Sequence, residues 1–307
     1  MPNLKDIKSR IQSVENTKKI TRAMKMVAAA KVKRAESTVK AGRPFSDELI
    51  KAFRKLLGAV GDYSGDGLDT KLPIENYPEL LKKREVKMAG ILVITSNKGL
   101  AGAYNANIVR NVLKQVQEYK EQGIESKLFV VGQKGILSLK RKITELKTEI
   151  VQTYTKVANE ISAAGAEAIA EDLAENFVSG NIDSIDIFTT RFKNMMSYSA
   201  EKWELLPINI EADREEAEGL EPVMIFEPNE QSILQKLVPL YITNTIYQAL
   251  LEAQASELAS RMTAMTAASN NAEEMIRTLT IDYNKARQWA ITQEILEVVS
   301  GADALKG

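Results

Sequence analysis

Two residue types are missing from this chain: its 307 residues include no cysteine and no histidine. Without cysteine there can be no disulfide, thiolate nucleophile or cysteine metal ligand. Without histidine the chain lacks the usual general base near neutral pH and the commonest metal ligand. Asp, Glu, Lys or Ser could still carry catalysis, but these absences disfavour a self-contained hydrolase or metalloenzyme. We therefore expect no catalytic residue, no cofactor and no metal site.

Long hydrophobic runs are also missing. No apolar stretch approaches the roughly 20 residues that span a bilayer, so we expect no direct membrane insertion. The segment Met1–Lys8 has neither the apolar core of a signal peptide nor the Ser- and Arg-rich character of a transit peptide. The sequence predicts a protein that stays on a cytoplasm-like side of a membrane.

Glycine and proline are absent from two long stretches, and the longer one lies near the carboxyl end. The stretch Leu240–Ser300 has 61 residues without either. In a helix interior glycine costs about 1 kcal/mol and proline about 3 kcal/mol, so their absence favours one uninterrupted helix. At about 1.5 Å per residue that helix would be about 90 Å long. A compact chain of this length has a radius of gyration of only about 19 Å. The helix must therefore be paired with, or surrounded by, something else.

The second stretch, Leu4–Ala41, opens the chain. Its apolar residues follow alternating steps of three and four, which is coiled-coil spacing, with one slip between Val14 and Ile20. Helical spacing resumes after Pro44, so we predict one helix to about Leu57, kinked near the proline. The apolar residues are Leu4, Ile7, Ile11 and Val14 before the slip, and Ile20, Met24 and Val27 after it.

The middle of the chain has the pattern of an α/β domain. Short continuous apolar runs predict buried strands, and helical stretches separate them. This alternation predicts a mostly parallel, Rossmann-like sheet. The predicted strands are 89–95, 127–131 and 185–189, the helices are 105–122 and 161–177, and segments 58–86 and 209–222 are loop-like.

The carboxyl-terminal helix carries a seam with polar interruptions. We predict that Asn229 caps this helix and that Pro239 either kinks it or starts its main part. Polar residues in the seam suit a coil that also presents polar groups outward. The seam positions are Ile233, Leu237, Leu240, Asn244, Tyr247, Leu251, Gln254, Leu258, Arg261, Met265, Ala268, Ala272, Met275 and Leu279, drifting to Tyr283, Ala286 and Ala290.

These patterns together predict an α/β protein with long helices: an antiparallel coiled coil of the N- and C-terminal helices plus a central Rossmann-like α/β domain. The predicted division is an N-terminal coiled-coil helix over 1–57, the α/β domain over 58–228, and a C-terminal coiled-coil helix over 229–307. Because the second helix is longer, its tip should protrude as a nearly bare helix.

Charge is unevenly spread although the formal net charge is zero. Residues 1–57 carry 15 Lys or Arg against 5 Asp or Glu, a net of +10. Lys and Arg at this density would contact nucleic-acid phosphates, but Ala, Val and Met fill the gaps instead of residues that read bases. A solvated face is a further alternative. We favour an acidic protein surface and expect no nucleic-acid partner. The basic stretch comprises Lys18, Lys19, Arg22, Lys25, Lys31, Lys33 and Arg34.

The block Gly99–Asn105 lies between a predicted strand and a predicted helix, where phosphate loops occur. Its glycine spacing matches neither the dinucleotide fingerprint nor the P-loop. A tight structural turn is favoured over a nucleotide site.

Polar residues crowd the end of the second helix, and an ordinary exposed face would explain them equally well. They are Tyr283, Lys285, Arg287, Gln288, Thr292, Gln293 and Glu294. Methionines in the two helical stretches are interpreted as coil packing, because flexible thioethers fill irregular gaps. These are Met24, Met26, Met262, Met265 and Met275.

At both ends the sequence resembles the gamma subunit of F-type ATP synthase, and the resemblance runs through the whole chain in order. It lies in Ile7–Ile11, Asn16–Lys31, Asn97–Asn105, Tyr283–Gln288, Ile291–Glu297 and Ser300–Ala302. The central block departs from the family pattern, with Asn97, Lys98 and Ala101 where the family has Asp, Arg and Cys. The role of that loop therefore stays open. Thiol regulation, a feature of plastid members, is not expected without cysteine.

The resemblance implies a non-catalytic rotor shaft. Its coiled coil would enter a ring of three alpha and three beta subunits, and its globular foot would join the epsilon subunit and the membrane c-ring. Proton flow would turn the shaft, which would favour a different conformation in each beta subunit. The protein would be a peripheral membrane protein on the cytoplasmic face of a bacterial plasma membrane or the stromal-type face of a thylakoid.

The family's contact residues carry over onto six positions. The resemblance implies that Arg287, Gln288 and Thr292 hydrogen-bond a loop of one beta subunit. It also implies that Arg22, Met24 and Lys25 lie near acidic loops of the beta subunits. The small residues of the tip would turn in a mainly apolar sleeve.

Two other classes stay open at this point. A static coiled-coil scaffold would share the long helices, and a nucleotide-using α/β enzyme would share the central domain. Whether the coupling ion is H⁺ or Na⁺ is likewise open.

Overall fold

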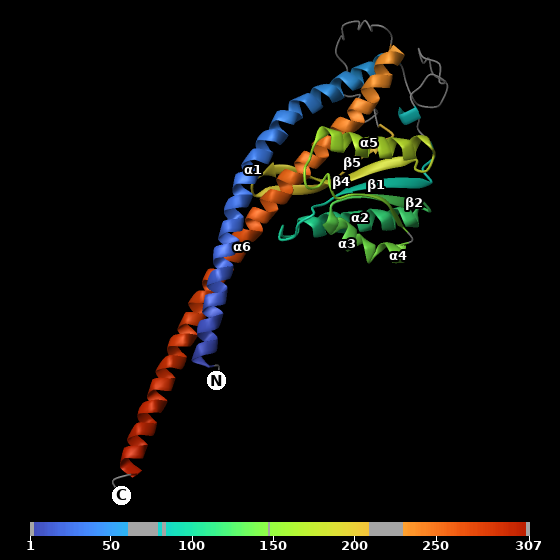
Figure 1. Ribbon diagram of the computed structural model, residues 1–307. Coiled ribbons are helices and arrows are strands. Elements are labelled where there is room, and N and C mark those ends of the chain that lie inside the picture. The colour runs from blue at the N-terminus through green and yellow to red at the C-terminus, as the bar shows by residue number, and fades with distance from the viewer. Residues whose placement is uncertain (1–2, 61–78, 82–83, 147, 209–229, 305–307) are drawn as a thin grey trace. The chain divides into compact units, whose positions relative to one another are not determined.

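Two long helices dominate the computed structural model, which describes residues 3–60, 79–81, 84–146, 148–208 and 230–304 (Figure 1). Helix α1 (Leu4–Val60) has 57 residues, and α6 (Glu230–Ala304) has 75. At about 1.5 Å per residue, α6 is about 110 Å long. The two predicted long helices are confirmed. Pro44 and Pro239 lie inside them, so neither proline begins or ends a helix. The predicted cap at Asn229 and the loop 209–222 lie outside the described residues.

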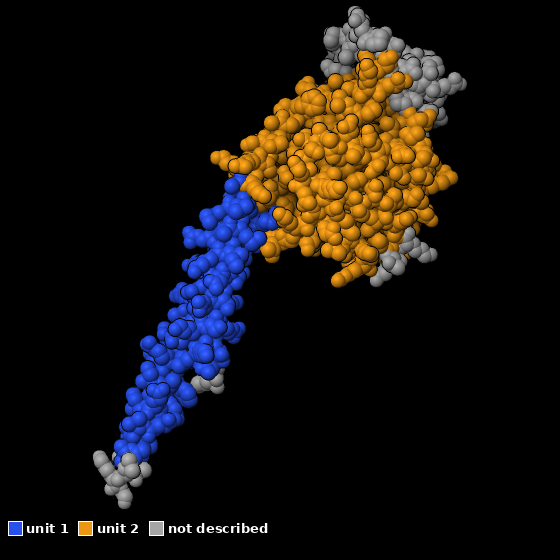
Figure 2. Space-filling view, viewed as in Figure 1, with its two compact units in different colours: residues 1–30, 261–307 blue, residues 31–260 orange. Residues whose placement is uncertain are grey.

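The chain divides into two compact units (Figure 2). Unit 1 contains residues 1–30 and 261–307, and unit 2 contains residues 31–260. Helices α1 and α6 contribute to both, so each unit is described by itself.

Unit 2 is built on one five-stranded sheet with the order β3-β2-β1-β4-β5. The first four strands are parallel and β5 is antiparallel to β4. The parallel part follows the strand order of a dinucleotide-binding fold, which confirms the predicted Rossmann-like sheet. The strands are β1 (Met88–Ile94), β2 (Glu125–Val131), β3 (Glu149–Tyr154), β4 (Ser184–Asn194) and β5 (Ser197–Leu206).

Helices cover both faces of this sheet (Figure 1). Leu92 and Ile94 of β1 pack with α5 (Ala163–Val178) and α6. Ile91 and Val93, which alternate with them, pack with α2 and α3 on the other face. This alternation is what a strand buried on both sides requires. The other short elements are α2 (Tyr104–Glu121), α3 (Gln133–Lys140), α4 (Ile143–Leu146) and the 3-10 turn η2 (Glu79–Leu81).

Within unit 2, α1 and α6 run antiparallel beside β4. Val32, Val39, Leu251 and Ala255 form a buried cluster with Phe192 of β4. The predicted seam at the start of α6 is off by one position, because Leu234 and Val238 are buried whereas the predicted Leu240 is 46% exposed. A two-helix seam is narrower than the face that α6 turns toward the sheet. This is the physical reason for the error.

Unit 1 is an antiparallel pair of helical segments, residues 4–30 of α1 and 261–304 of α6. Lys18 Nζ lies 3.2 Å from Glu273 Oε1, which shows the register of the two segments. The shielded row on α1 keeps steps of three and four without a break: Leu4, Ile7, Ile11, Val14, Lys18, Thr21, Lys25 and Ala28. The predicted slip is therefore wrong, and Ile20 and Val27 are 60% and 58% exposed. Thr21 and the aliphatic parts of the Lys18 and Lys25 side chains fill the seam between Val14 and Ala28, so the helices keep one register.

The facing row on α6 in unit 1 matches the predicted seam with one exception. The shielded positions are Met265, Ala268, Ala272, Ile276, Leu279, Tyr283, Ala286 and Ala290. Ile276 takes the place predicted for Met275, which is 52% exposed. Met26 is 60% exposed as well, so the packing interpretation is wrong for these two methionines.

Candidate partner-binding surface

The end of α6 is a bare helix. Every side chain from Ile291 to Ala302 is exposed, and within unit 1 no described residue of α1 lies beside this segment. The red end of α6 extends past the start of α1 (Figure 1), which confirms the predicted protruding tip. Five of its side chains are large and apolar and at least 47% exposed: Ile291, Ile295, Leu296, Val298 and Val299. Contiguous exposed apolar surface of this kind marks an interaction site.

A second exposed apolar row runs along α1. Ile20, Ala23, Val27 and Ala30 are spaced by three and four and are all exposed. This row explains why the apolar spacing in the sequence changes between Val14 and Ile20. The apolar residues after Val14 do not shift the seam but form a row that α6 does not cover. The slip was the signal that could have identified this surface from the sequence.

The six predicted contact residues all lie in unit 1 and remain at least partly accessible. On α1, Arg22 is exposed, and Met24 and Lys25 are half-buried. On α6, Arg287, Gln288 and Thr292 are exposed. The Thr292 hydroxyl donates to the Gln288 carbonyl over 2.9 Å, which is an ordinary bond within a helix.

The structure does not bring these six residues together. Lys18 faces Glu273, and because the two helices are antiparallel, residues after Lys18 on α1 lie beside residues before Glu273 on α6. Residues 22–25 therefore lie beside the part of α6 before Glu273, whereas residues 287–292 lie at and beyond the start of α1. Unit 1 presents two separate contact regions, one near each end.

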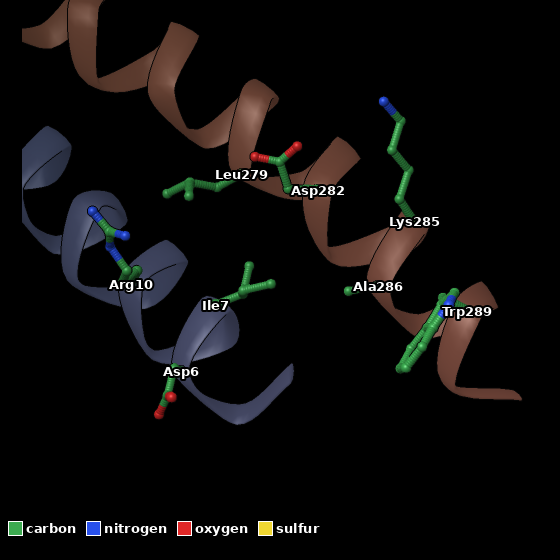
Figure 3. A pocket seen from close by; sticks show the side chains of 8 residues that line it. All are labelled: Asp6, Ile7, Arg10, Leu279, Asp282, Lys285, Ala286 and Trp289. Carbon is green, nitrogen blue, oxygen red and sulfur yellow. The ribbon is translucent and has the colours of Figure 1, made fainter. Parts of the chain in front are cut away.

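A groove lies next to the second region, between the first turns of α1 and the facing part of α6 (Figure 3). It encloses about 530 Å³. Sequence reasoning did not anticipate this groove, because it forms only where the two helices face each other. Its apolar lining is Ile7, Leu279, Ala286 and Trp289, and its charged lining is Asp6, Arg10, Asp282 and Lys285. Trp289 is 52% exposed and directly follows the predicted contact residue Gln288 in the sequence, although none of the predicted contact residues lines the groove.

The block Gly99–Asn105 is a structural turn that docks on α6 within unit 2. The Ala101 carbonyl accepts a hydrogen bond from Ser260 Oγ at 2.7 Å, and Tyr104 is buried in the core. Asn105 Oδ1 accepts from the Ser96 backbone N–H at 3.0 Å. Leu100 and Gly102 have φ angles of 63° and 53°, which give the turn its tight path. The Ala101 carbonyl and the Asn105 side chain are thus bound within the protein itself, which supports the structural interpretation.

In the part of the chain that the structure describes, no group of three or more acidic side chains is placed to hold a metal ion. No helix among these residues is long and apolar enough to cross a membrane.

Comparisons with known proteins agree with these features. A family model described as ATP synthase matches residues 3–305. The ATP synthase gamma chain of Gloeothece citriformis is 41% identical over 331 residues, which cover 99% of this chain and all of that relative. The gamma chain of a Picosynechococcus species is 42% identical over 329 residues with the same coverage.

Solved structures with a similar fold come from mitochondrial ATP synthases. A chain from the central stalk and c-ring structure of Tetrahymena thermophila is 27% identical, with a TM-score of 0.56 over 81% of this chain and 99% of its own length. A chain from the Euglena gracilis OSCP, F1 and c-ring structure has a TM-score of 0.64 over 98% of this chain and 94% of its own length. Its identity of 16% makes it evidence of fold alone. The family model and the two gamma chains match nearly the full length of this chain. The chain therefore belongs to the ATP synthase gamma family.

Proposed function

We propose that this chain is the central-stalk rotor of an F-type ATP synthase, which couples ion flow through the membrane sector to ATP synthesis or hydrolysis in a ring of alpha and beta subunits. The gamma chains that it resembles and the central stalk whose fold it shares support this assignment. The chain has no catalytic site of its own in this proposal. Its action is mechanical: each shaft orientation interacts unequally with the open and closed states of a ring subunit, and this difference drives the change.

One observation carries the proposal: the large apolar side chains from Ile291 to Val299 are at least 47% exposed and are not covered by any described element of their unit. Burying an apolar side chain the size of leucine is worth about 1.5–3 kcal/mol, so five such side chains left in water are a large unused driving force. A ring that surrounds the tip would bury them, and the small residue Ala302 beyond them would leave room to turn. A static adaptor would also bury an apolar surface, but it would not explain the full-length gamma-chain match.

The foot is proposed to be the α/β domain, over residues 58–228, and the shaft to be the helices over 1–57 and 229–307. The foot would bind the epsilon subunit and the membrane c-ring. The Tetrahymena structure, which contains both a central stalk and a c-ring, supports this arrangement for the relative.

The contact residues are proposed in two groups. Exposed Arg22, with Met24 and Lys25, would face acidic loops of the beta subunits, where exposed charges attract without rigid interlocking. Arg287, Gln288 and Thr292 would hydrogen-bond a loop of one beta subunit beside the groove at Trp289.

The proposed location is the cytoplasmic face of a plasma membrane or the stromal-type face of a thylakoid, where the chain would be peripheral. The cyanobacterial origin of its relatives supports either face. The coupling ion is proposed to be the proton.

Affinity purification of the tagged chain from native membranes tests the function. We expect the alpha and beta subunits of the ATPase to be recovered with it in fixed proportion. Recovery of the intact chain without them would overturn the rotor assignment.

A matched pair of variants tests the tip. Leu296→Asp places a charge where an apolar sleeve would be, whereas Gln293→Asp changes a side chain that is already polar and exposed. We expect Leu296→Asp to reduce ATP synthesis by membrane vesicles much more than Gln293→Asp does, while both isolated chains unfold like the wild type. Equal activity of the two assembled variants would contradict an apolar sleeve.

A further inference from the structure

The last part of β4 has no strand on one side. Strand β1 pairs with β4 only as far as Val93 opposite Phe188, whereas β5 continues along the other side of β4 to the pair Asn194 and Ser197. Beyond Phe188, the edge of β4 that faces away from β5 therefore has backbone donors and acceptors without a partner among the described strands. Buried backbone groups of this kind need other partners.

The two long helices supply these partners. The backbone N–H of Phe192 donates to Glu252 Oε2 of α6 at 2.8 Å. The carbonyl of the same residue accepts from Arg43 Nη2 of α1 at 2.7 Å. One strand residue is thus held on both of its backbone groups by side chains from two helices, as a neighbouring strand would hold it. Thr189 of β4 adds a bond of 3.1 Å from its hydroxyl to the Ala249 carbonyl of α6.

The two side chains that hold Phe192 also hold each other. Arg43 Nε lies 2.8 Å from Glu252 Oε1, and its Nη2 lies 3.0 Å from Oε2, which is a bidentate pair. Gln248 Nε2 adds a bond of 3.2 Å to Glu252 Oε1. Each carboxylate oxygen therefore accepts two hydrogen bonds. The side chain of Glu252 is completely buried, and its hydrogen bond raises the pKa of Arg43.

Gly42 of α1 faces Gln248 of α6 at the level of this pair. A Cβ atom at Gly42 would lie 2.9 Å from Gln248 Oε1, the end of a flexible side chain, so a larger residue there would require Gln248 to move.

Stability alone gives little reason for such a pair. A buried ion pair is often no better for stability than apolar residues of the same volume. The pair adds interactions that depend on orientation, since each of its hydrogen bonds weakens when one of the joined elements rotates against another. It joins α1, α6 and β4 at a single point in a way that apolar packing, which is non-directional, does not.

We propose that Arg43 and Glu252 are positioning residues that resist torsion between the sheet and the two long helices. Torque then passes between the foot and the shaft, and the two turn through the same angle. This inference rests on the proposed rotor function. The neighbouring apolar cluster at Val39 and Leu251 keeps the elements in contact, and the ion pair fixes their angle.

Single-molecule recordings of the assembled enzyme test this proposal. The ring is fixed to a surface and a probe attached to the α/β domain reports its angle while no nucleotide is turned over. The variance of that angle is inversely proportional to the torsional stiffness between probe and ring. Two variants are compared with the wild type. Arg43→Lys keeps the positive charge but loses the bidentate geometry of the guanidinium, and the double variant Arg43→Met/Glu252→Met replaces the pair with apolar side chains of similar volume. We expect each of them to raise the angular variance at least about twofold.

Glu201→Gln is the matched control. Glu201 pairs with Arg191 at 3.3 Å, and both residues lie on neighbouring strands of the same sheet, so this pair does not join the sheet to a helix. The control should leave the variance unchanged. ATP hydrolysis without load should stay near the wild-type rate in all these variants, whereas ATP-driven ion pumping against a gradient should slow in the Arg43 variants.

An unchanged angular variance in both Arg43 variants would overturn the proposal. So would an equal loss of unloaded hydrolysis and pumping, because that result means general damage. If the double variant does not assemble, the Arg43→Lys result decides. Failure of the rotor function itself would be distinct, because the wild-type chain would then be recovered without alpha and beta subunits.

Discussion

Two segments of the same helix have opposite surroundings. Between Ala249 and Ser260 of α6, in unit 2, every side chain except Gln254 is buried. Between Ile291 and Ala302, in unit 1, every side chain is exposed. Both segments are rich in apolar residues, so hydrophobicity alone does not separate them. The difference is that the first packs on a sheet and on α1, and the second has no described neighbour within its unit.

This contrast separates two uses of apolar surface. In unit 2 it stabilises the fold, because its neighbours are part of the same chain. In unit 1 most of it contributes little to the isolated chain, and it contributes to binding if a partner covers it. Substitutions should therefore change stability in unit 2 and assembly in unit 1.

The largest effect is expected at Leu250, which is 1% exposed in the main core. Leu250→Ala removes buried methyl groups and leaves a cavity, so it should lower the free energy of unfolding by about 2–5 kcal/mol. Leu296→Ala, at a side chain that is 55% exposed, should change it by no more than about 0.5 kcal/mol. Urea unfolding of the isolated chain measures both values. A large loss from Leu296→Ala would show that the tip is packed in the free protein.

Two glycines extend the comparison to the backbone. Gly132, between β2 and α3, has a φ of 94°, and a Cβ there would lie 2.3 Å from the Thr95 carbonyl oxygen. Gly132→Ala should therefore destabilise the isolated chain by about 1–3 kcal/mol. Gly301 lies inside α6, and a Cβ added there would have nothing within 4 Å, so Gly301→Ala should stabilise the helix by about 0.5 kcal/mol. Thermal unfolding should shift in opposite directions, and shifts of the same sign would contradict this account.

Much of the fold follows from the sequence by simple rules. The absence of glycine and proline predicted both long helices, and the continuous apolar runs predicted β1, β2 and the start of β4. Strands β3 and β5 were not predicted. They are the edges of the sheet, and exposed polar side chains such as Gln152 and Lys202 interrupt the apolar pattern there.

The candidate site was predictable only in part. Resemblance to the family named the six contact residues, and the structure places them in two accessible regions without testing the contacts. The pattern alone placed Ile20 and Val27 in the seam, whereas they are exposed. Periodicity shows that a helix has an apolar row, but whether another helix of the chain covers that row depends on the register of the pair.

A buried charge in unit 2 gives a dependence on pH. Burial raises the pKa of Asp186 above its ordinary value of 3.8, and the negative charge of nearby Glu204 adds to this rise, although Tyr119 and Lys202 bind the carboxylate and oppose it. The folded state therefore binds this proton more readily than the unfolded chain does. The resulting contribution to stability is fully present below the ordinary pKa and is lost as pH rises through the raised pKa.

The variant Asp186→Asn removes this titration. We expect its free energy of unfolding, relative to that of the wild type, to be higher at neutral pH than below the ordinary pKa of 3.8, where the carboxyl is protonated in the folded and the unfolded wild type. Urea unfolding across this pH range measures the difference. A constant difference at all pH values would show that Asp186 does not titrate as its burial requires.

The smallest effect is expected at the ion pair of unit 1. Lys18 and Glu273 lie 3.2 Å apart with side chains 29% and 68% exposed, so water and salt screen them. A double-mutant cycle of Lys18→Ala and Glu273→Ala, followed by far-ultraviolet circular dichroism, should give a coupling of about 0.2–1 kcal/mol. The coupling should vanish near 1 M salt, where the Debye length is about 3 Å. The pair of Arg43 and Glu252 should retain most of its coupling under the same salt, because its carboxylate is completely buried and only the Arg43 side chain, 34% exposed, is open to solvent ions. If instead the Lys18 coupling survived and the Arg43 coupling did not, the division between a packed unit and an exposed one would be wrong.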